Sequence, residues 1–218
     1  MYDVRQMLKL YFIAGTQDCP NPTADRIQNL LLILEQALQA GITCFQFRDK
    51  GKNSLEEQPE SQKNLAIQCR DLCRRYQVPF IVDDNVALAI EIGADGVHVG
   101  QQDMSPIMIR QITNQPLIIG LSNNTLEDLW RSEQIIEVDY CGVGPVFPTN
   151  SKANHNPSIG LDFIKKAREA GIRKPIVAIG GIKEEHIVTL KENGADGVAV
   201  ISAISLASDV SRAVKALQ

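Results

Sequence analysis

Short apolar, β-branched runs alternate with longer amphipathic segments along this 218-residue chain. The expected strands are residues 9–13, 43–47, 80–82, 97–99, 117–121, 140–143, 176–179 and 198–201. The expected helices are residues 23–39, 55–76, 105–113, 126–134, 161–170, 184–193 and 208–217. Such alternation is typical of a parallel sheet whose strands are joined by helices.

A repeated phrase divides the chain into two halves. Gly93-Ala-Asp-Gly-Val-His-Val99 returns as Gly194-Ala-Asp-Gly-Val-Ala-Val200, close to half the chain length later. A repeat of that period favours a closed, two-halved architecture over a solenoid. Together with eight strands, each followed by a helix or a helix-like segment, it predicts an α/β fold, a single-domain TIM (β/α)8 barrel spanning residues 1–218. The alternative, an open doubly wound sheet, would usually carry G-x-G-x-x-G where this chain has Ala14-Gly15-Thr16-Gln17.

Composition removes several classes of function. The net charge of −4 argues against nonspecific nucleic-acid binding, which needs a basic face. No apolar run approaches the ~18 residues that span a bilayer, and the N-terminus lacks a signal-peptide layout, so the expected location is cytoplasmic. The five cysteines form no C-x-x-C motif. We interpret them as reduced thiols, with Cys69 and Cys73 on or under a helix, because a zinc site would need two more ligands nearby.

Two cations follow the second expected strand. In a barrel, catalytic groups lie at the C-terminal ends of the strands. Arg48 and Lys50 are two positions apart, so an extended chain points both side chains the same way. The plainer alternative is a surface salt bridge between these cations and Asp49.

Three carboxylates follow the third and fourth strands. Asp83 and Asp84 are adjacent, and Asp103 follows the neighbouring strand. Carboxylates at a barrel mouth repel one another unless a cation joins them, and a small set of oxygen ligands suits Mg²⁺. Alternatively, Asp83 or Asp84 caps the helix that starts near Asn85. Asp103 on the next strand favours the metal site.

Small and hydroxyl-bearing residues follow the last four strands. They are Ser122, then Thr149, Ser151 and Lys152, then Gly180 and Gly181, and finally Ile201 and Ser202. Glycines expose backbone N–H groups, and barrels often bind a phosphate between the seventh and eighth loops, although a tight turn alone could explain the glycine pair. Residues 51–62 and 147–158 have loop composition, and the second stretch would lie on the catalytic face as a lid.

These candidates describe two anion sites. Mg²⁺ with Arg48, Lys50 and Lys152 suits a diphosphate, whereas a backbone nest suits a monophosphate. The sequence offers no Ser-His-Asp set and no Cys-His pair for nucleophilic catalysis. Of the histidines, His98 is expected to point into the barrel as a packed, hydrogen-bonded residue, and His186 is expected on a helix in solvent.

Six blocks in fixed order resemble the thiamine phosphate synthase family. They are Gln46-Phe-Arg-Asp-Lys50, Val78-Pro-Phe-Ile-Val-Asp-Asp84, Gly96-Val-His-Val-Gly-Gln-Gln-Asp103, Gly142-Val-Gly-Pro-Val-Phe-Pro-Thr149, Ile179-Gly-Gly-Ile182 and Val200-Ile-Ser-Ala-Ile204. The resemblance extends from Leu10 to Ile204. Its specificity comes from several blocks in register, because Gly-Ala-Asp-Gly-Val alone is widespread in phosphate-binding barrels.

The resemblance implies a reaction and a set of roles. A pyrimidine diphosphate, 4-amino-2-methyl-5-pyrimidinylmethyl diphosphate, would join 4-methyl-5-(2-phosphoethyl)thiazole and release pyrophosphate. Asp84 and Asp103 would ligate Mg²⁺. The diphosphate would be held by Gln46, Arg48, Lys50 and Lys152, with Asp83 beside them and Ser122 near the pyrimidine. The thiazole phosphate would contact Thr149, Ser151, Gly180 and Gly181, and the backbone of Ile201 and Ser202.

Two positions depart from the family pattern. Asp83 replaces the usual Asn, which puts its role in diphosphate binding in question. Asn124 stands where many relatives have His, and a sister branch, the thiazole tautomerases, relies on a His in that loop. The synthase is therefore favoured over a tautomerase or a regulatory barrel that binds phosphorylated ligands. The sequence leaves open whether the chain forms a homo-oligomer.

Overall fold

The computed structural model describes residues 2–19, 25–149 and 157–218. Within these residues, eight parallel strands close into a barrel in chain order, which confirms the predicted TIM barrel. The strands are β1 (Leu10–Ala14), β2 (Cys44–Phe47), β3 (Phe80–Asp83), β4 (Gly96–Val99), β5 (Ile118–Asn123), β6 (Tyr140–Val143), β7 (Ile176–Ile179) and β8 (Gly197–Val200). The sheet closes because β1 pairs with both β2 and β8.

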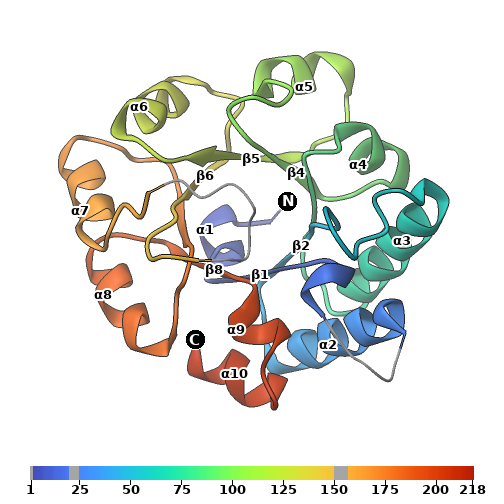
Figure 1. The fold of residues 1–218 in the computed structure, drawn as a ribbon. Coiled ribbons are helices and arrows are strands. Elements are labelled where there is room, and N and C mark those ends of the chain that lie inside the picture. Colours follow the sequence, from blue (N-terminus) through green and yellow to red (C-terminus); the bar gives the residue numbers. More distant parts are fainter. Residues whose placement is uncertain (1, 20–24, 150–156) are drawn as a thin grey trace.

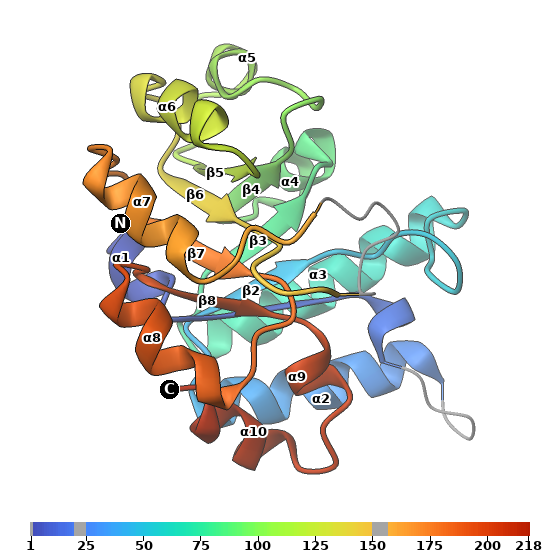
Figure 2. The same cartoon turned by 60° about the vertical axis from the view of Figure 1, so that its left-hand side comes forward.

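Helices surround the strands in a ring, with α1 lying over the centre of the barrel (Figure 1). They are α1 (Val4–Met7), α2 (Arg26–Ala40), α3 (Pro59–Arg75), α4 (Val86–Ile92), α5 (Pro106–Ile112), α6 (Leu126–Gln134), α7 (Asp162–Glu169), α8 (Ile187–Glu192), α9 (Ser202–Ser205) and α10 (Val210–Ala216), with 3₁₀ turns η1 (Thr16–Asp18) and η2 (Glu184–His186). The ring is completed where α10 packs against α2, as Figure 2 also shows. Across the described residues, no helix is long and apolar enough to cross a membrane.

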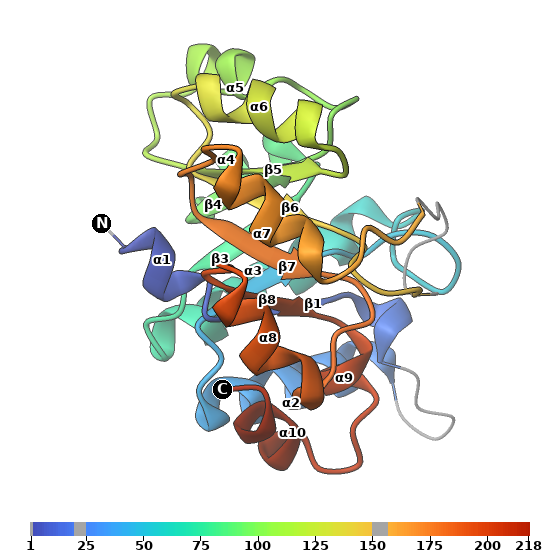
Figure 3. The ribbon, with the colours of Figure 1, turned by 90° about the vertical axis from the view of Figure 1, so that its left-hand side faces the viewer.

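The two ends of the barrel differ. At the N-terminal end, α1 lies across the barrel, and its Met7, with the adjacent Leu8, packs against residues that point inward from the strands. Figure 3 shows α1 at one end and the loop after β2 at the other. One end is therefore closed by packing, which leaves the C-terminal ends of the strands for a site.

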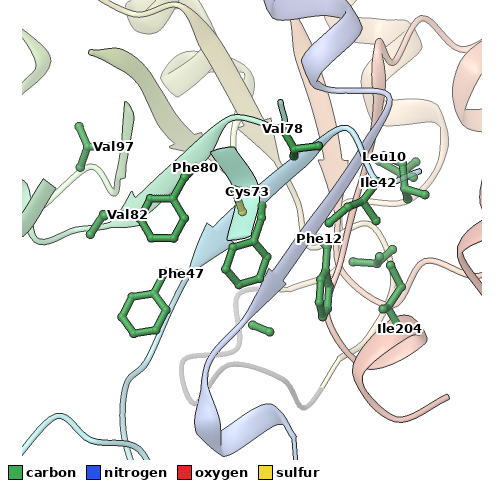
Figure 4. Packing of buried hydrophobic residues seen from close by; sticks show 14 of the residues in the cluster. Leu10, Phe12, Ile42, Phe47, Cys73, Val78, Phe80, Val82, Val97 and Ile204 are labelled. Carbon is green, nitrogen blue, oxygen red and sulfur yellow. The ribbon is translucent and has the colours of Figure 1, made fainter. Parts of the chain in front are cut away.

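Each strand divides its side chains between two cores. In β1, Tyr11 and Ile13 point into the barrel, whereas Leu10 and Phe12 face the surrounding helices. The outer core holds most of the large apolar residues, and Figure 4 shows Phe12 among them. This period of two predicts that polar residues at inward positions gather inside the barrel.

The repeated phrase ties neighbouring strands together. Asp95 accepts a hydrogen bond from the backbone N–H of Phe80, at the start of β3, with an N···O distance of 2.9 Å. Asp196 does the same for Ile176, at the start of β7, at 2.8 Å. Because both carboxylates satisfy strand-end donors, the aspartates of the phrase have a structural role.

The second glycine of each phrase allows a close strand approach. A Cβ on Gly197 would lie 1.8 Å from the carbonyl oxygen of Leu8, and a Cβ on Gly96 would lie 2.3 Å from that of Ile118. No side chain fits at either position. The doubled phrase is therefore a requirement of the barrel wall, while the residues that follow it are free to differ.

Several predicted boundaries and elements were wrong. The predicted 51–62 loop ends earlier, because α3 begins at Pro59, and the predicted 184–193 helix opens with the 3₁₀ turn η2. The predicted helices did not include α1 or α9, and α4 was predicted only as a helix that starts near Asn85, without an end. These elements are short, and the apolar sequence of α4 shows no clear period.

All five cysteines are buried and free of disulfides, as expected for reduced thiols. Cys69 and Cys73 lie on the inward face of α3. Burial raises the pKa of Cys19 and of Cys141 to about 12, so both remain protonated near neutral pH. These side chains behave as small apolar core residues.

Candidate active site

A large open cavity lies at the C-terminal ends of the strands. Its volume is about 1390 Å³, which is room for two small ligands. The candidate residues that line it are Arg48, Lys50, Asp83, Asp84, Asp103, Ser122, Thr149, Gly180, Gly181, Ile201 and Ser202. Ser151 and Lys152 lie outside the described residues. Gln46 lines a smaller cavity inside the barrel, which Ser122 also lines.

Arg48 and Lys50 converge on one carboxylate. The Oδ2 atom of Asp83 lies 3.4 Å from Arg48 Nε and 3.9 Å from Lys50 Nζ. The Asp83 side chain is only 8 % exposed, whereas that of Lys50 is 36 % exposed. A buried carboxylate thus holds two cations at the cavity wall, with the more exposed one able to reach an anion in the cavity.

The alternative salt bridge to Asp49 was wrong. Asp49 is 4 % exposed and turns away from the cavity. Its carboxylate accepts hydrogen bonds from the backbone N–H and hydroxyl of Thr16, at 2.8 and 2.6 Å, and from the N–H of Leu55, at 2.9 Å. Asp49 therefore anchors the loops after β1 and β2 instead of pairing with Arg48.

We expect Asp49→Ala to lower the free energy of unfolding by about 2 kcal/mol, because buried donors lose their acceptor. Denaturant unfolding measures the change. The matched control is Asp71→Ala, an exposed carboxylate bonded to Arg70, which should change stability by less than about 0.5 kcal/mol. Equal effects of the two substitutions would contradict the anchoring role.

Asp84 and Asp103 meet in the cavity. Both side chains line this cavity, and the Asp103 carboxyl lies close enough to Asp84 to affect its pKa. Burial raises the pKa of Asp84, the adjacent Asp103 adds to this rise, and the bond from Lys50 opposes it. Two neighbouring carboxylates concentrate negative charge in the cavity, which a divalent cation would relieve.

Lys50 also bonds directly to Asp84. Burial by itself lowers the pKa of the Lys50 ammonium, but the bond to Asp84 and the charges of Asp83 and Asp84 outweigh burial and raise that pKa. Lys50 is therefore charged throughout the neutral range. A cation that took its place at Asp84 would release this ammonium toward a bound anion.

Helix capping does not occupy the carboxylates of Asp83 and Asp84. The cap of α4 is Asn85, whose side chain accepts from the backbone N–H of Leu88 at 3.0 Å. The alternative that an aspartate caps this helix was therefore wrong. Asp84 has a φ of +54°, in the left-handed region, and its N–H bonds the carbonyl of His98 at 2.8 Å. This turn directs the strand end toward β4, where Asp103 follows.

The donor set fits Mg²⁺ better than a transition metal. Among the described side chains, no group of three or more His, Cys, Asp and Glu is arranged to hold a metal. Two carboxylates at an open cavity leave most coordination positions to water and to substrate oxygens, as Mg²⁺ prefers. Asp103 also accepts from the backbone N–H of Gly100 at 2.7 Å, which fixes its loop.

The glycine pair after β7 allows the loop after β6 to approach. Gly180 has a φ of +103°, and a Cβ there would lie 2.6 Å from Cα of Pro145. A Cβ on Gly181 would lie 2.7 Å from the carbonyl oxygen of Pro148. The β6 and β7 loops therefore touch through backbone, and Thr149 lies at the edge of that contact on the cavity wall.

His186 differs from its prediction. It ends the 3₁₀ turn η2, and its ring stacks on Phe147, with centroids 3.9 Å apart. The predicted solvated position on a helix was wrong, because this stack buries most of the ring. Asn124 donates from its side-chain amide to the carbonyl of Gly144, which secures the start of the β6 loop.

Hydrogen bonds cross the inside of the barrel below the cavity. Gln46, 2 % exposed, donates from Nε2 to the Tyr11 hydroxyl at 2.9 Å. That hydroxyl lies 2.9 Å from the Tyr140 hydroxyl. His98 Nδ1 lies 3.0 Å from the Tyr140 hydroxyl, and His98 Nε2 lies 2.9 Å from Ser122 Oγ. His98 is therefore packed and hydrogen-bonded inside the barrel, as predicted.

Neither tyrosine was predicted as a residue of the site. They occupy inward positions of their strands, in line with Ile13 and Gly142 two residues later. The available signal was the period of two, applied to polar residues within the strands and not only to those after them.

The sequence of this chain is similar to that of known proteins over its full length. Residues 10–204 match the family model described as thiamine monophosphate synthase. A thiamine-phosphate synthase of Actinobacillus pleuropneumoniae serotype 7 (strain AP76) is 86 % identical over 217 residues, covering 100 % of both chains. One from Haemophilus influenzae (strain ATCC 51907 / DSM 11121 / KW20 / Rd) is 59 % identical, covering 100 % of this chain and 96 % of that protein.

A solved structure agrees with the fold. Thiamine phosphate pyrophosphorylase from Pyrococcus furiosus superposes with a TM-score of 0.82 at 34 % identity. The match covers 99 % of this chain and 96 % of that one. Fold and sequence thus point to the same relatives over the full length.

Proposed function

The chain belongs to the thiamine monophosphate synthase family, and from this premise we propose how its barrel binds two substrates and joins them. The enzyme is a transferase that makes thiamine phosphate. The two alternatives, a tautomerase and a regulatory barrel that binds phosphorylated ligands, do not agree with relatives that are named as synthases and match the full chain. What remains to propose is the substrate placement, the metal and the role of each side chain.

The diphosphate of 4-amino-2-methyl-5-pyrimidinylmethyl diphosphate binds between β2, β3 and β4 in this proposal. Arg48 and Lys50 face it as fixed cations, and the resemblance to the family adds Lys152. Asp84 and Asp103 would hold Mg²⁺, which would supply charge stabilisation for the departing pyrophosphate. The observation that carries the proposal is that these two carboxyls and Lys50 line one open cavity, with Lys50 bonded to Asp84.

The second substrate binds on the opposite side of the cavity. We place the phosphate of 4-methyl-5-(2-phosphoethyl)thiazole near Thr149 and Ser151 and the backbone of Gly180, Gly181, Ile201 and Ser202. Support comes from the wall that the β6, β7 and β8 loops share. Backbone N–H groups at such loops bind phosphate in many barrels.

The chemistry asks for positioning more than for acid–base catalysis. The amino group of the pyrimidine stabilises a methylene cation as the C–O bond to pyrophosphate breaks. The thiazole nitrogen then forms the new C–N bond with its lone pair. Arg48 and Lys50 stabilise the charge that develops on the leaving group, and the cavity walls align the two rings. Ser122 contacts the pyrimidine.

The test is pyrophosphate release from both substrates with Mg²⁺, compared with either substrate alone. We expect release only when all three are present, with thiamine phosphate formed in equal amount. Release without Mg²⁺ would contradict the metal role. Isomerisation of a thiazole without condensation would contradict the placement of both substrates.

We expect Asp83→Asn to keep or improve turnover. The amide retains an acceptor for Arg48, while loss of the charge reduces repulsion of the diphosphate. Steady-state kinetics with both substrates measures this, and a loss beyond about tenfold, roughly 1.4 kcal/mol, would contradict it. The matched comparison is Asp83→Ala, which removes the acceptor as well and should be slower than Asp83→Asn.

The proposal also covers the domain organisation, the cellular location and the oligomeric state. Residues 1–218 act as one domain, which is supported by the pairing of β1 with β8 from opposite ends of the chain. We also propose a cytoplasmic location, in line with reduced, buried cysteines. Size-exclusion chromatography with light scattering would establish whether the enzyme is a homo-oligomer.

A further inference from the structure

The five hydrogen-bonded groups inside the barrel form an unbroken chain. It runs from Gln46 on β2, through Tyr11 on β1, Tyr140 on β6 and His98 on β4, to Ser122 on β5. Each link has a donor–acceptor distance of 2.9–3.0 Å. This hydrogen-bond chain joins two candidate substrate-binding residues, Gln46 and Ser122, through three residues that have no assigned role.

The barrel makes room for this chain with glycines. A Cβ on Gly120 would lie 2.2 Å from Cζ of Tyr140 and 2.4 Å from Nδ1 of His98. A Cβ on Gly142 would lie 2.9 Å from Cε1 of His98. Both rings therefore occupy space that any larger residue on β5 or β6 would fill. Such a fit holds the imidazole in one orientation.

The Gln46 amide determines which group donates in each hydrogen bond of this network. The Gln46 amide N–H donates to the Tyr11 oxygen, so the Tyr11 hydrogen must point elsewhere. Its neighbours are the Tyr140 oxygen and the Cys44 sulfur, of which sulfur is the weaker acceptor. Burial raises the pKa of both tyrosines well above 10, so each retains a hydrogen to donate. Tyr11 thus donates to Tyr140, and Tyr140 donates to His98.

We propose that this buried chain fixes His98 as the Nε2–H tautomer and thereby aims the Ser122 hydroxyl hydrogen into the active-site cavity. Nδ1 accepts from Tyr140, so the imidazole hydrogen resides on Nε2 and is donated to Ser122 Oγ. With its oxygen accepting from His98, Ser122 directs its own hydrogen away from the imidazole. Ser122 lines both the inner and the outer cavity, so the hydroxyl can donate to a ring nitrogen of the pyrimidine.

Tyr11 and Tyr140 are positioning residues in this account, because they act on the substrate through His98 and Ser122. The effect on the pyrimidine rests on the function proposed above. The tautomer does not, because it is a property of the free protein. The two parts can therefore fail separately.

Nitrogen NMR of histidine-labelled enzyme reads the tautomer directly. The chain has three histidines, so His155→Gln and His186→Gln identify the His98 signals by elimination. We expect a protonated Nε2 and an unprotonated Nδ1 in the wild type. A protonated Nδ1 in the wild type would overturn the proposal without the use of any variant.

Steady-state kinetics measure the effect of the His98 tautomer on catalysis. We expect Tyr140→Phe to mix the tautomers of His98 and to lower kcat/KM for the pyrimidine diphosphate about tenfold, because one buried acceptor loses its donor. KM for the thiazole phosphate should be unchanged. Tyr11→Phe, which leaves the donor to His98 in place, should have a smaller effect in the same direction.

A matched control is Tyr76→Phe. That hydroxyl bonds Gln39 on the outer helices at 3.1 Å, so the same chemical change outside the barrel should leave tautomer and kinetics as in the wild type. A single Nε2–H tautomer and wild-type kcat/KM in Tyr140→Phe would overturn the positioning role. Failure of the wild type to release pyrophosphate would instead count against the proposed function.

Discussion

Replacing Asp103 with alanine is expected to lower Mg²⁺-dependent turnover by about three orders of magnitude, or roughly 4 kcal/mol of transition-state stabilisation. Asp103 meets Asp84 in the cavity and completes the pair of carboxylates that would hold the metal. Binding of the thiazole phosphate should persist, because that substrate is placed on the β6–β8 side. Pyrophosphate release measures the first effect, and calorimetric titration with the thiazole phosphate measures the second.

Two further variants separate charge from loop structure. Asp103→Asn keeps an acceptor for the Gly100 N–H but removes the charge, so it should lose nearly as much activity as Asp103→Ala. Gln102→Ala changes the adjacent exposed position on the same cavity wall and should stay near the wild-type rate. Full activity of Asp103→Ala would contradict the metal site, and an inactive Gln102→Ala would attribute the loss to the loop.

Replacing Gly180 with alanine is expected to destabilise the fold by about 3 kcal/mol or more. The φ of +103° is costly for any L side chain, and the new Cβ would overlap the backbone of Pro145. Because the β6 loop must then move, binding of the thiazole phosphate should weaken at least about tenfold, even at a temperature where the variant is folded. Thermal unfolding and calorimetric titration measure the two effects.

Gly171→Ala is the matched control for the backbone strain. Its φ of +98° is nearly the same, but the nearest atom to the new Cβ, on the Trp130 ring, would lie 3.9 Å away. We expect this variant to lose only about 1–2 kcal/mol and to bind the thiazole phosphate normally. Equal losses in the two variants would show that φ alone, and not the contact between loops, explains the requirement for glycine.

The barrel could be predicted because its strands carry a strong local signal. Every expected strand is present, with ends displaced by at most two residues. The helix α4 was harder, since Val86–Ile92 is almost wholly apolar and shows no face. The short α1 begins at a cap, Asp3, but is too short for a periodic pattern.

The candidate site could be predicted where residues directly follow strands. Arg48, Asp84 and Asp103 line one cavity because the strand ends of a parallel barrel meet at the same rim. Which of these side chains pair with one another could not be predicted. Asp49 is as close in sequence to Arg48 as any residue, yet it turns outward to bond Thr16, since pairing depends on tertiary contacts across strands.

The interior network needed the three-dimensional register. Tyr140 and His98 lie on non-adjacent strands, and only barrel closure brings their side chains to 3.0 Å. The repeated phrase illustrates the same limit. Its two copies predicted a two-halved barrel, but the structural role of Asp95 and Asp196 depends on the strand that each one joins.

The central claim is that the carboxylates of Asp84 and Asp103 hold a divalent cation against a diphosphate bound by Arg48 and Lys50. Anomalous diffraction from crystals soaked with Mn²⁺ and pyrophosphate tests it most directly. We expect one manganese peak beside the two carboxylates, with pyrophosphate oxygens next to it and Lys50 moved from Asp84 onto the anion. Manganese bound elsewhere, with Lys50 still on Asp84 and pyrophosphate in place, would contradict the account.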